Sequence, residues 1–145
     1  MGTTTYSFSD IQAVITHPSF SSMSIYNEGV GDMTFNKTNV NTVHDLAADG
    51  SVMVSKIVAK NGSVIINAQQ TSNLHRYFND LFNYLESAPT DEWSQIQLDL
   101  RAPKLHEQKI CVGGSFQKQG DTPYQQQGQR VSWTLMFAQI SNQRI

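Results

Sequence analysis

The sequence predicts a mainly β protein, either an antiparallel β-sandwich or a partly open barrel, with one α-helix packed on its side. Two observations lead to this fold class. Most apolar residues alternate with polar ones in short runs bounded by Gly, Pro, Asn or Asp, which is the pattern of strands. Only residues 73–86 place apolar side chains at helical spacing. We expect residues 1–145 to form a single domain, with residues 1–5 as a flexible N-terminal tail.

The stretch from Gly50 to Gln70 is predicted to form a central hairpin. Val52–Ala59 and Ser63–Gln70 have the composition of strands, and Asn61-Gly62 between them suits a type I′ turn because both residues tolerate positive φ. Neither strand has a cleanly polar face. We therefore expect both faces of this hairpin to be covered.

The single predicted helix follows the hairpin. Ser72 is a suitable N-cap, since its hydroxyl can accept a hydrogen bond from a free backbone N–H, and Pro89 marks the end. We expect the aromatic stripe of this helix to pack on the hairpin as core. Its apolar positions are Leu74, Tyr77, Phe78, Leu81, Phe82, Tyr84 and Leu85.

The flanking segments predict further strands with exposed edges. The apolar residues of Ser19–Asn27 either close on the core or form a surface for a partner. Few Lys or Pro residues protect the strand edges, and one way to satisfy such edges is to pair them with the next subunit of a closed ring. The predicted strands are Tyr6–Thr16, Asp32–Thr38, Val40–Leu46, Gln95–Arg101, Gln108–Gln117 and Val131–Ile140, and the last is apolar on both faces, as in a central strand or an interface.

The charge balance argues against binding of nucleic acid by a basic surface. The net charge is −2, so the chain has no basic footprint. The first 50 residues carry a net −4, with five carboxylates against Lys37, and the remainder carries a net +2. Cys111 is the only cysteine, and no stretch resembles a signal peptide or a membrane span. We expect folding in a reducing cytoplasm and no membrane binding.

The sequence shows no pattern typical of an enzyme, a cofactor site or a metal site. The four histidines lack metal-ligand spacing, and the glycine pairs lack the residues that complete a dinucleotide or phosphate loop. Cys111 lies in an apolar alternating run, where a lone cysteine is usually a small core residue. A nucleophilic Cys111 assembled with a distant His and Asp is the alternative.

One arrangement of short motifs resembles a known family. Ala48-Asp49-Gly50, a strand, Asn61-Gly62, a second strand, Gln70-Thr71-Ser72 and a helix follow one another in this order, and Trp133-Thr134-Leu135 follows a polar loop. This order and spacing, over roughly residues 6–140, is similar to that of the tail tube proteins of contractile-tailed bacteriophages.

The resemblance implies a structural virion protein made in the host cytoplasm, without catalysis or cofactors. It implies hexameric rings that stack into a tube and conduct DNA during ejection. The implied partners are further copies, the tail sheath protein, baseplate or tail initiator and terminator proteins, and a tape measure protein in the lumen. The alternatives are a pyocin or type VI-like secretion tube, a tail terminator, or an unrelated β-barrel binding module or enzyme.

Simple geometry agrees with such a channel. If six subunits each give four strands to one barrel, strands ~4.8 Å apart and tilted ~40° give a backbone radius of about 24 Å. Side chains of roughly 5 Å then leave a lumen about 38 Å wide, which admits a DNA duplex about 20 Å across. A sliding duplex favours a neutral or acidic wall. We therefore expect Asp32, Asp45 and Asp49 near the lumen or the seam between rings.

Overall fold

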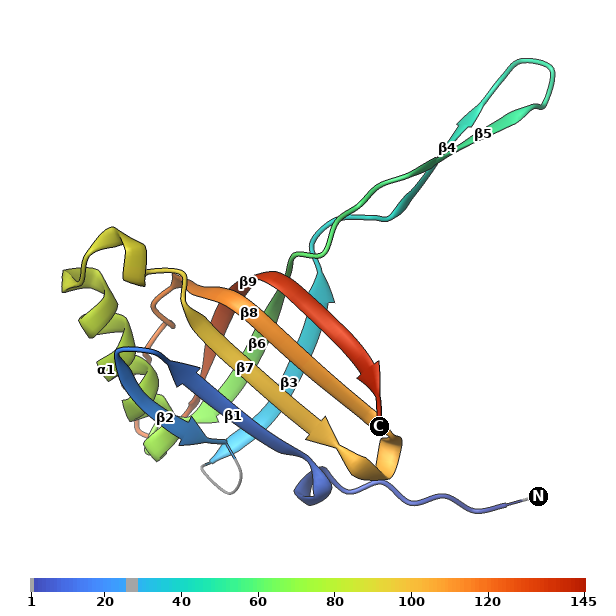
Figure 1. Cartoon of the computed structure of the whole chain (residues 1–145). Coiled ribbons are helices and arrows are strands. Elements are labelled where there is room, and N and C mark those ends of the chain that lie inside the picture. The colour runs from blue at the N-terminus through green and yellow to red at the C-terminus, as the bar shows by residue number, and fades with distance from the viewer. Residues whose placement is uncertain (1, 26–28) are drawn as a thin grey trace.

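The computed structural model describes residues 2–25 and 29–145. Seven strands form one antiparallel sheet in the order β2-β1-β7-β8-β9-β6-β3, which curls into a half-barrel with helix α1 on one side (Figure 1). Strands β4 and β5 form a separate hairpin that points away from the barrel. The elements are β1 (Gln12–His17), β2 (Phe20–Ser24), β3 (Val30–Lys37), β4 (Thr42–Leu46), β5 (Val52–Lys56), β6 (Gly62–Gln69), α1 (Asn73–Ser87), β7 (Ile96–Ala102), β8 (Glu107–Lys118) and β9 (Arg130–Arg144).

The predicted mainly β, antiparallel fold with one helix is confirmed, in the form of a partly open barrel. A single sheet can enclose its own apolar face only by curling. The curl brings strands together that are not neighbours in the sheet. The Nζ atom of Lys109 on β8 lies 5.4 Å from the ring centroid of Phe35 on the edge strand β3.

The core lies between the sheet and α1 and follows from strict alternation. In β6 and β7 every second side chain is buried. A long-range ladder joins β6 to β9 and places Val64 opposite Leu135, and Ile66 opposite Trp133, all four side chains being inaccessible to solvent. Truncating a buried side chain of this size costs about 3–5 kcal/mol, so this ladder is a major source of stability.

Helix α1 begins and ends where the sequence predicts. The Ser72 side chain accepts a hydrogen bond from the backbone N–H of His75 at 3.1 Å, which is the N-cap arrangement. The helix ends at Ser87, two residues before Pro89. Its buried residues are Leu74, His75, Tyr77, Phe78, Leu81, Phe82 and Leu85, which are the predicted stripe with His75 added, while the predicted Tyr84 is only partly buried.

Trp133 is the centre of the aromatic core. Its ring centroid lies 5.4 Å from that of Phe116 on β8 and 5.5 Å from that of Phe78 on α1. Its indole N–H donates to Nδ1 of His75 at 3.1 Å, and the side-chain amide of Asn79 lies 3.2 Å from the other ring nitrogen. Because Nδ1 accepts this bond, the neutral form of His75 is the one that fits the core.

The predicted central hairpin is wrong. Asn61-Gly62 is not a turn, because β6 begins at Gly62 and pairs with β3 and β9, while β5 pairs only with β4. Glycine is needed at position 62 for close approach, since a Cβ there would lie 2.4 Å from the Asn36 carbonyl oxygen. The distant apolar face of β9 gives β6 a buried partner that β5 could not supply, and this outweighs the local turn signal.

The N-terminal region also differs from the expected Tyr6–Thr16 strand. Ser7 caps a short 3-10 turn, Phe8–Asp10, and β1 begins only at Gln12. The following segment forms β2, which pairs with β1 and closes on the core through Phe20 and Ile25. Three residues lie outside the described ranges: Tyr26 and Asn27 of the segment Ser19–Asn27, and Glu28, one of the five carboxylates of the first 50 residues.

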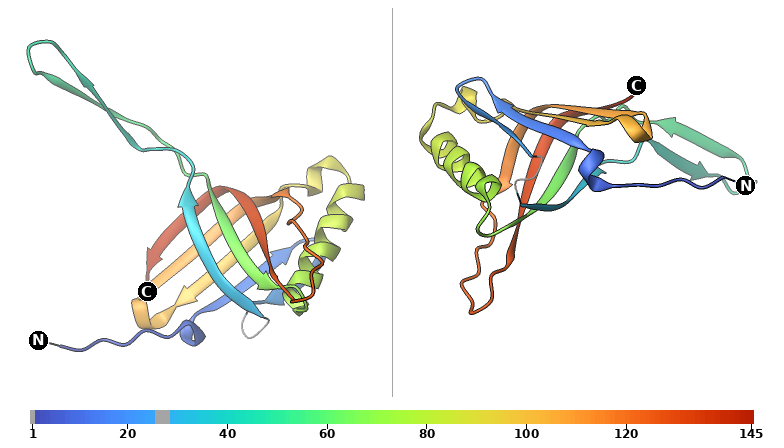
Figure 2. Two further views of the ribbon diagram at one scale, coloured as in Figure 1. Left: turned by 180° about the vertical axis from the view of Figure 1, so that it is seen from behind. Right: turned by 90° about the horizontal axis from the view of Figure 1, so that it is seen from below.

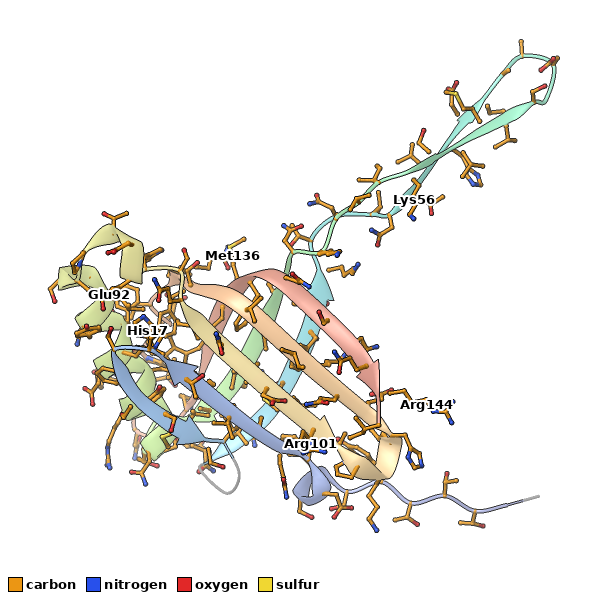
Figure 3. All side chains as sticks on the ribbon, viewed as in Figure 1. His17, Lys56, Glu92, Arg101, Met136 and Arg144 are labelled. Carbon is orange, nitrogen blue, oxygen red and sulfur yellow. The ribbon has the colours of Figure 1, made fainter. Side chains whose placement is uncertain are left out.

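At the far end of β1, His17 links the sheet to the segment after α1. Its Nδ1 accepts from the backbone N–H of Ser19 at 3.1 Å, so Nε2 carries the proton and donates to the Glu92 carbonyl at 2.8 Å. Figure 3 shows His17 and Glu92 side by side at the helix end of the barrel. The other predicted strands are confirmed, and β9 extends beyond its expected end at Ile140 to Arg144.

The buried His75 predicts that acid weakens the fold. Burial lowers the pKa of His75 from its ordinary 6.5. The unfolded chain therefore binds a proton first, and the free energy of unfolding should be highest above pH 6.5 and fall as the pH drops toward the folded-state pKa. His75→Gln keeps an acceptor for Trp133 without titrating, so it should flatten this part of a pH series of urea denaturation. The matched control His44→Gln, on the exposed β4, should keep it; an unchanged slope in His75→Gln would contradict the assignment.

Candidate assembly surfaces

A projecting hairpin, residues 38–61, is the most exposed feature of the chain, and we refer to it as the arm. The β3–β6 ladder ends at the pair Lys37–Gly62, and the chain then leaves the barrel. The β4–β5 ladder runs from the pair Thr42–Lys56 to the pair Leu46–Val52, and every residue in it is exposed. Figures 1 and 2 show the arm reaching far beyond the barrel, with α1 on the opposite side. Figure 3 places Lys56 on the arm, away from the barrel.

The arm exposes large apolar side chains on both faces. One face holds the cross-strand pairs Leu46–Val52 and His44–Val54, and the other holds Val43–Ser55 and Asp45–Met53. Leu46 is 71% exposed, Met53 62% and Val54 61%. The expectation that both faces are covered is therefore wrong for a single chain. A two-stranded hairpin is marginal in water, and large apolar side chains at this density mark an interaction site.

Polar side chains hold the base of the arm where no regular ladder exists. The ammonium group of Lys37 donates to the Ala59 carbonyl at 3.1 Å and to Oδ1 of Asn41 at 3.3 Å. The Asn41 side-chain amide donates to the Ile57 carbonyl at 3.0 Å, and the Ile57 backbone N–H donates to the Asn41 carbonyl at 2.9 Å. These bonds tie the two segments together over the gap between the ladders.

The turn at the tip of the arm holds one of the predicted acidic residues and lies beside another. Gly50 has φ +92°, and its backbone N–H donates to the Ala47 carbonyl at 3.0 Å, so residues 47–50 form the turn. The Ser51 backbone N–H donates to Oδ1 of Asp49 at 3.0 Å, which lowers the pKa of Asp49. Asp45 lies on the Met53 face of the arm. The structure thus brings Asp45 and Asp49 near one another on the arm and places Asp32 elsewhere.

Asp32 lies on β3, on the face of the sheet opposite the buried core, which we call the helix-free face. The Asn67 side-chain amide on β6 donates to Oδ1 of Asp32 at 2.5 Å, and the Ser132 hydroxyl on β9 bonds to Oδ1 of Asn67. The central part of this face is otherwise uncharged. It comprises Ser63, Ile65 and Asn67 of β6, Ser132, Thr134 and Met136 of β9, Ser115 of β8, and Thr34 and Asn36 of β3.

The sheet ends in two strands whose outer edges have no partner among the described residues. β2 and β3 occupy the two ends of the strand order. Unpaired backbone N–H and C=O groups along such edges are templates for pairing with another chain. The sequence predicted exposed strand edges, but it did not predict that residues 38–61 project from the barrel. The usable signal was the absence of a polar face on residues 52–59.

The groups considered for chemistry are dispersed or buried. Cys111 is inaccessible to solvent, and burial raises its pKa to about 12, so its thiol is a core group. Over residues 2–25 and 29–145, no three His, Cys, Asp or Glu side chains gather as metal ligands. No helix in the same ranges has the length and apolar character needed to cross a membrane.

Solved structures with the same fold are components of phage-like injection particles. The tube-terminating cap structure of the anti-feeding prophage is 6% identical, covering 100% of this chain and 95% of that chain at a TM-score of 0.62. A chain of the 6-fold symmetrised baseplate structure of the same particle is 8% identical in sequence. The match covers 99% of this chain and 98% of that chain at a TM-score of 0.64. The sheath–tube complex of the PVC extracellular contractile injection system is 8% identical, covering 96% and 91% at 0.58.

Sequence comparison gives the family. No curated protein matches the chain. The model of the bacteriophage PhiTE tail tube protein family matches residues 3–144, nearly the whole sequence. This chain belongs to the bacteriophage PhiTE tail tube protein family.

Proposed function

We propose that this protein is the repeating subunit of a phage tail tube, forming hexameric rings that stack around a channel for DNA. The observation that supports this most directly is the arm, whose apolar side chains are exposed on both faces. Exposed apolar surface of this kind is stabilised when another chain covers it. The role is structural, and the protein works by self-assembly rather than catalysis.

Ring closure would use the free edges of the sheet. A contact between the β3 edge of one copy and a different edge on the next is heterologous, and such contacts close into a ring when the rotation between copies allows it. Main-chain hydrogen bonds would then continue from copy to copy, as in β-augmentation. The 6-fold symmetrised particle among the fold neighbours is compatible with six copies.

The helix-free face is suited to line the channel. Its central residues are mainly Ser, Thr, Asn and other uncharged side chains, with Asp32 as the fixed charge. The central residues of such a wall include no basic group that would release counterions from DNA and hold it, and Arg130 and Lys118 lie beside Ser132 and Thr134 on the same face. Twenty-four strands contributed by six copies leave roughly 38 Å for the lumen, wider than a duplex. Asp45 and Asp49 on the arm would then lie at the seam between rings.

The subunit would work within a tail and with tail proteins. The partners we propose are a sheath protein outside the tube, initiator or baseplate and terminator proteins at its ends, and a tape measure protein inside it during assembly in the host cytoplasm. A second candidate is the tube of an extracellular injection system, which the similarity to the anti-feeding prophage and PVC structures favours. Detection of DNA ejection by particles that contain this chain would decide between the two.

The first test is assembly of the purified chain. Negative-stain microscopy and light scattering should show rings or tubes for the native protein. Val54→Asp places a charge in the apolar face of the arm and should abolish these particles, because burying an unpaired carboxylate is costly. The free energy of unfolding of the monomer should change by no more than about 0.5 kcal/mol, since Val54 is exposed. Asn83→Asp on the exposed face of α1 adds the same charge and should still assemble; a strictly monomeric native chain would refute the proposal.

The second test is protection of the arm. In the monomer, trypsin should cut first after Lys56, because β5 is held only by β4. Arg101 is equally exposed but lies on β7, between β1 and β8, and should be cut much later. Assembly should slow cleavage at Lys56 at least tenfold while leaving the order of other sites unchanged. Mass spectrometry of the fragments would show this, and equal cleavage at Lys56 in tubes and monomers would count against a buried arm.

The third test addresses the channel wall. Asp32→Lys should slow DNA ejection from intact particles, because a ring of ammonium groups attracts phosphates, and added salt should relieve the effect. Asp80→Lys, on the exposed face of α1, makes the same charge change outside the proposed lumen and should leave ejection unchanged. Asp45→Lys and Asp49→Lys separate the lumen from the seam, since a seam position should alter ring stacking instead. An Asp32→Lys particle that ejects DNA at the native rate would exclude Asp32 from the wall.

A further inference from the structure

The barrel has an apolar cavity between its two edge strands, β2 and β3, where it fails to close, and we call this the seam cavity. The cavity measures about 160 Å³ and is lined by Ile11 and Ala13 at the start of β1, Ile25 after β2, and Val30 and Met33 at the start of β3, together with Phe8, Ser9 and Gly29. Among the residues that the structure describes, no charged side chain lines it. An apolar cavity of about 150 Å³ is large enough to take a ring the size of benzene, so this one can hold the end of an aliphatic side chain.

The cavity and the arm lie at opposite ends of the same strand. The cavity takes its β3 residues from Val30 to Met33, and the arm leaves β3 after Lys37. Figure 1 shows β3 running from the N-terminal end of β1 to the base of the arm. If copies stack in one orientation with β3 directed along the tube, the arm end of one copy faces the cavity end of the next. The 12 residues from 38 to 49, at ~3.3 Å each, give the arm a reach of roughly 40 Å.

We propose that the cavity receives Leu46 and Val52 from the arm of another copy of this chain, in the adjacent ring. This pair is the outermost of the β4–β5 ladder, and its members are 71% and 51% exposed. The proposal rests on the stacked tube proposed above and assigns the surfaces that join one ring to the next. The contact is heterologous, so every copy both inserts an arm and receives one.

The pleat of the arm decides which face docks. Leu46, Val52 and Val54 share one face with His44 and Lys56, whereas Asp45 lies on the opposite face beside Met53. Inserting the second face would bring a carboxylate into an apolar cavity whose described lining residues include no cation to pair with it, which is costly. The docking face carries the cation Lys56 instead. Asp10, exposed between the lining residues Ser9 and Ile11, offers it a partner of opposite charge.

Disulfide cross-linking tests the contact directly. In assembled particles under mild oxidation, the double variant Leu46→Cys/Ile11→Cys should give a ladder of covalent oligomers longer than dimers, because each link is head to tail. Each single variant should stay monomeric on a non-reducing gel. The native Cys111 should not react, because it is buried and its pKa is raised to about 12. The matched control Val43→Cys/Ile11→Cys uses the other face of the arm and should give no ladder.

The outcomes separate this inference from the proposed function. Tubes without a 46–11 bond, or with a 43–11 bond in its place, would overturn the docking assignment and leave the tube intact. A native chain that forms no rings or tubes would overturn both proposals. Ala13→Leu fills the cavity from within and should block stacking while the monomer keeps a cooperative thermal transition. Normal tubes from a folded Ala13→Leu protein would also overturn the assignment.

Discussion

The fold depends on the long-range pairing of β6 with β9. This ladder buries Val64, Ile66, Leu135 and Trp133 beneath α1 and satisfies the backbone of both strands. It also removes β6 from β5, its neighbour in sequence. Because β5 can then pair only with β4, the apolar segment between the barrel strands becomes a projecting arm. The part of the chain that is most unusual for a monomer is thus a direct consequence of the way the core is built.

The protein separates a closed interior from an open periphery. Around Trp133 the aromatic rings are closely packed and the His75 hydrogen bond requires a neutral imidazole, so we expect protonation of His75 to destabilise this region. The arm, the two sheet edges and the seam cavity have the reverse character, with apolar or backbone groups left without partners among the described residues. The core of this molecule is fully packed, whereas its surface leaves apolar side chains and backbone groups exposed. Such surfaces agree with membership of a tail tube family.

Much of the architecture could be predicted from local patterns. The alternation in Ile96–Ala102 and the helical stripe from Leu74 to Leu85 arise from backbone periodicity and burial, which a sequence displays directly. The prediction of a turn at Asn61-Gly62 was wrong because a dipeptide indicates only which backbone conformations its own residues tolerate. Gly62 is required by the nearby Asn36 carbonyl, a neighbour 26 positions away that no local signal reveals.

By itself, the sequence determined the strand-rich class, the capped helix, the absence of a polar face on residues 52–59 and the order of motifs that points to the tube family. The tertiary structure alone decided which strands are neighbours, that residues 52–56 stand in solvent on both faces, that Asp32 is separated from Asp45 and Asp49, and that a cavity opens at the far end of β3 from the arm. The physical reason is that periodicity assigns each side chain to a face within its own element. Which face is finally buried depends on competition between distant strands for the same partner.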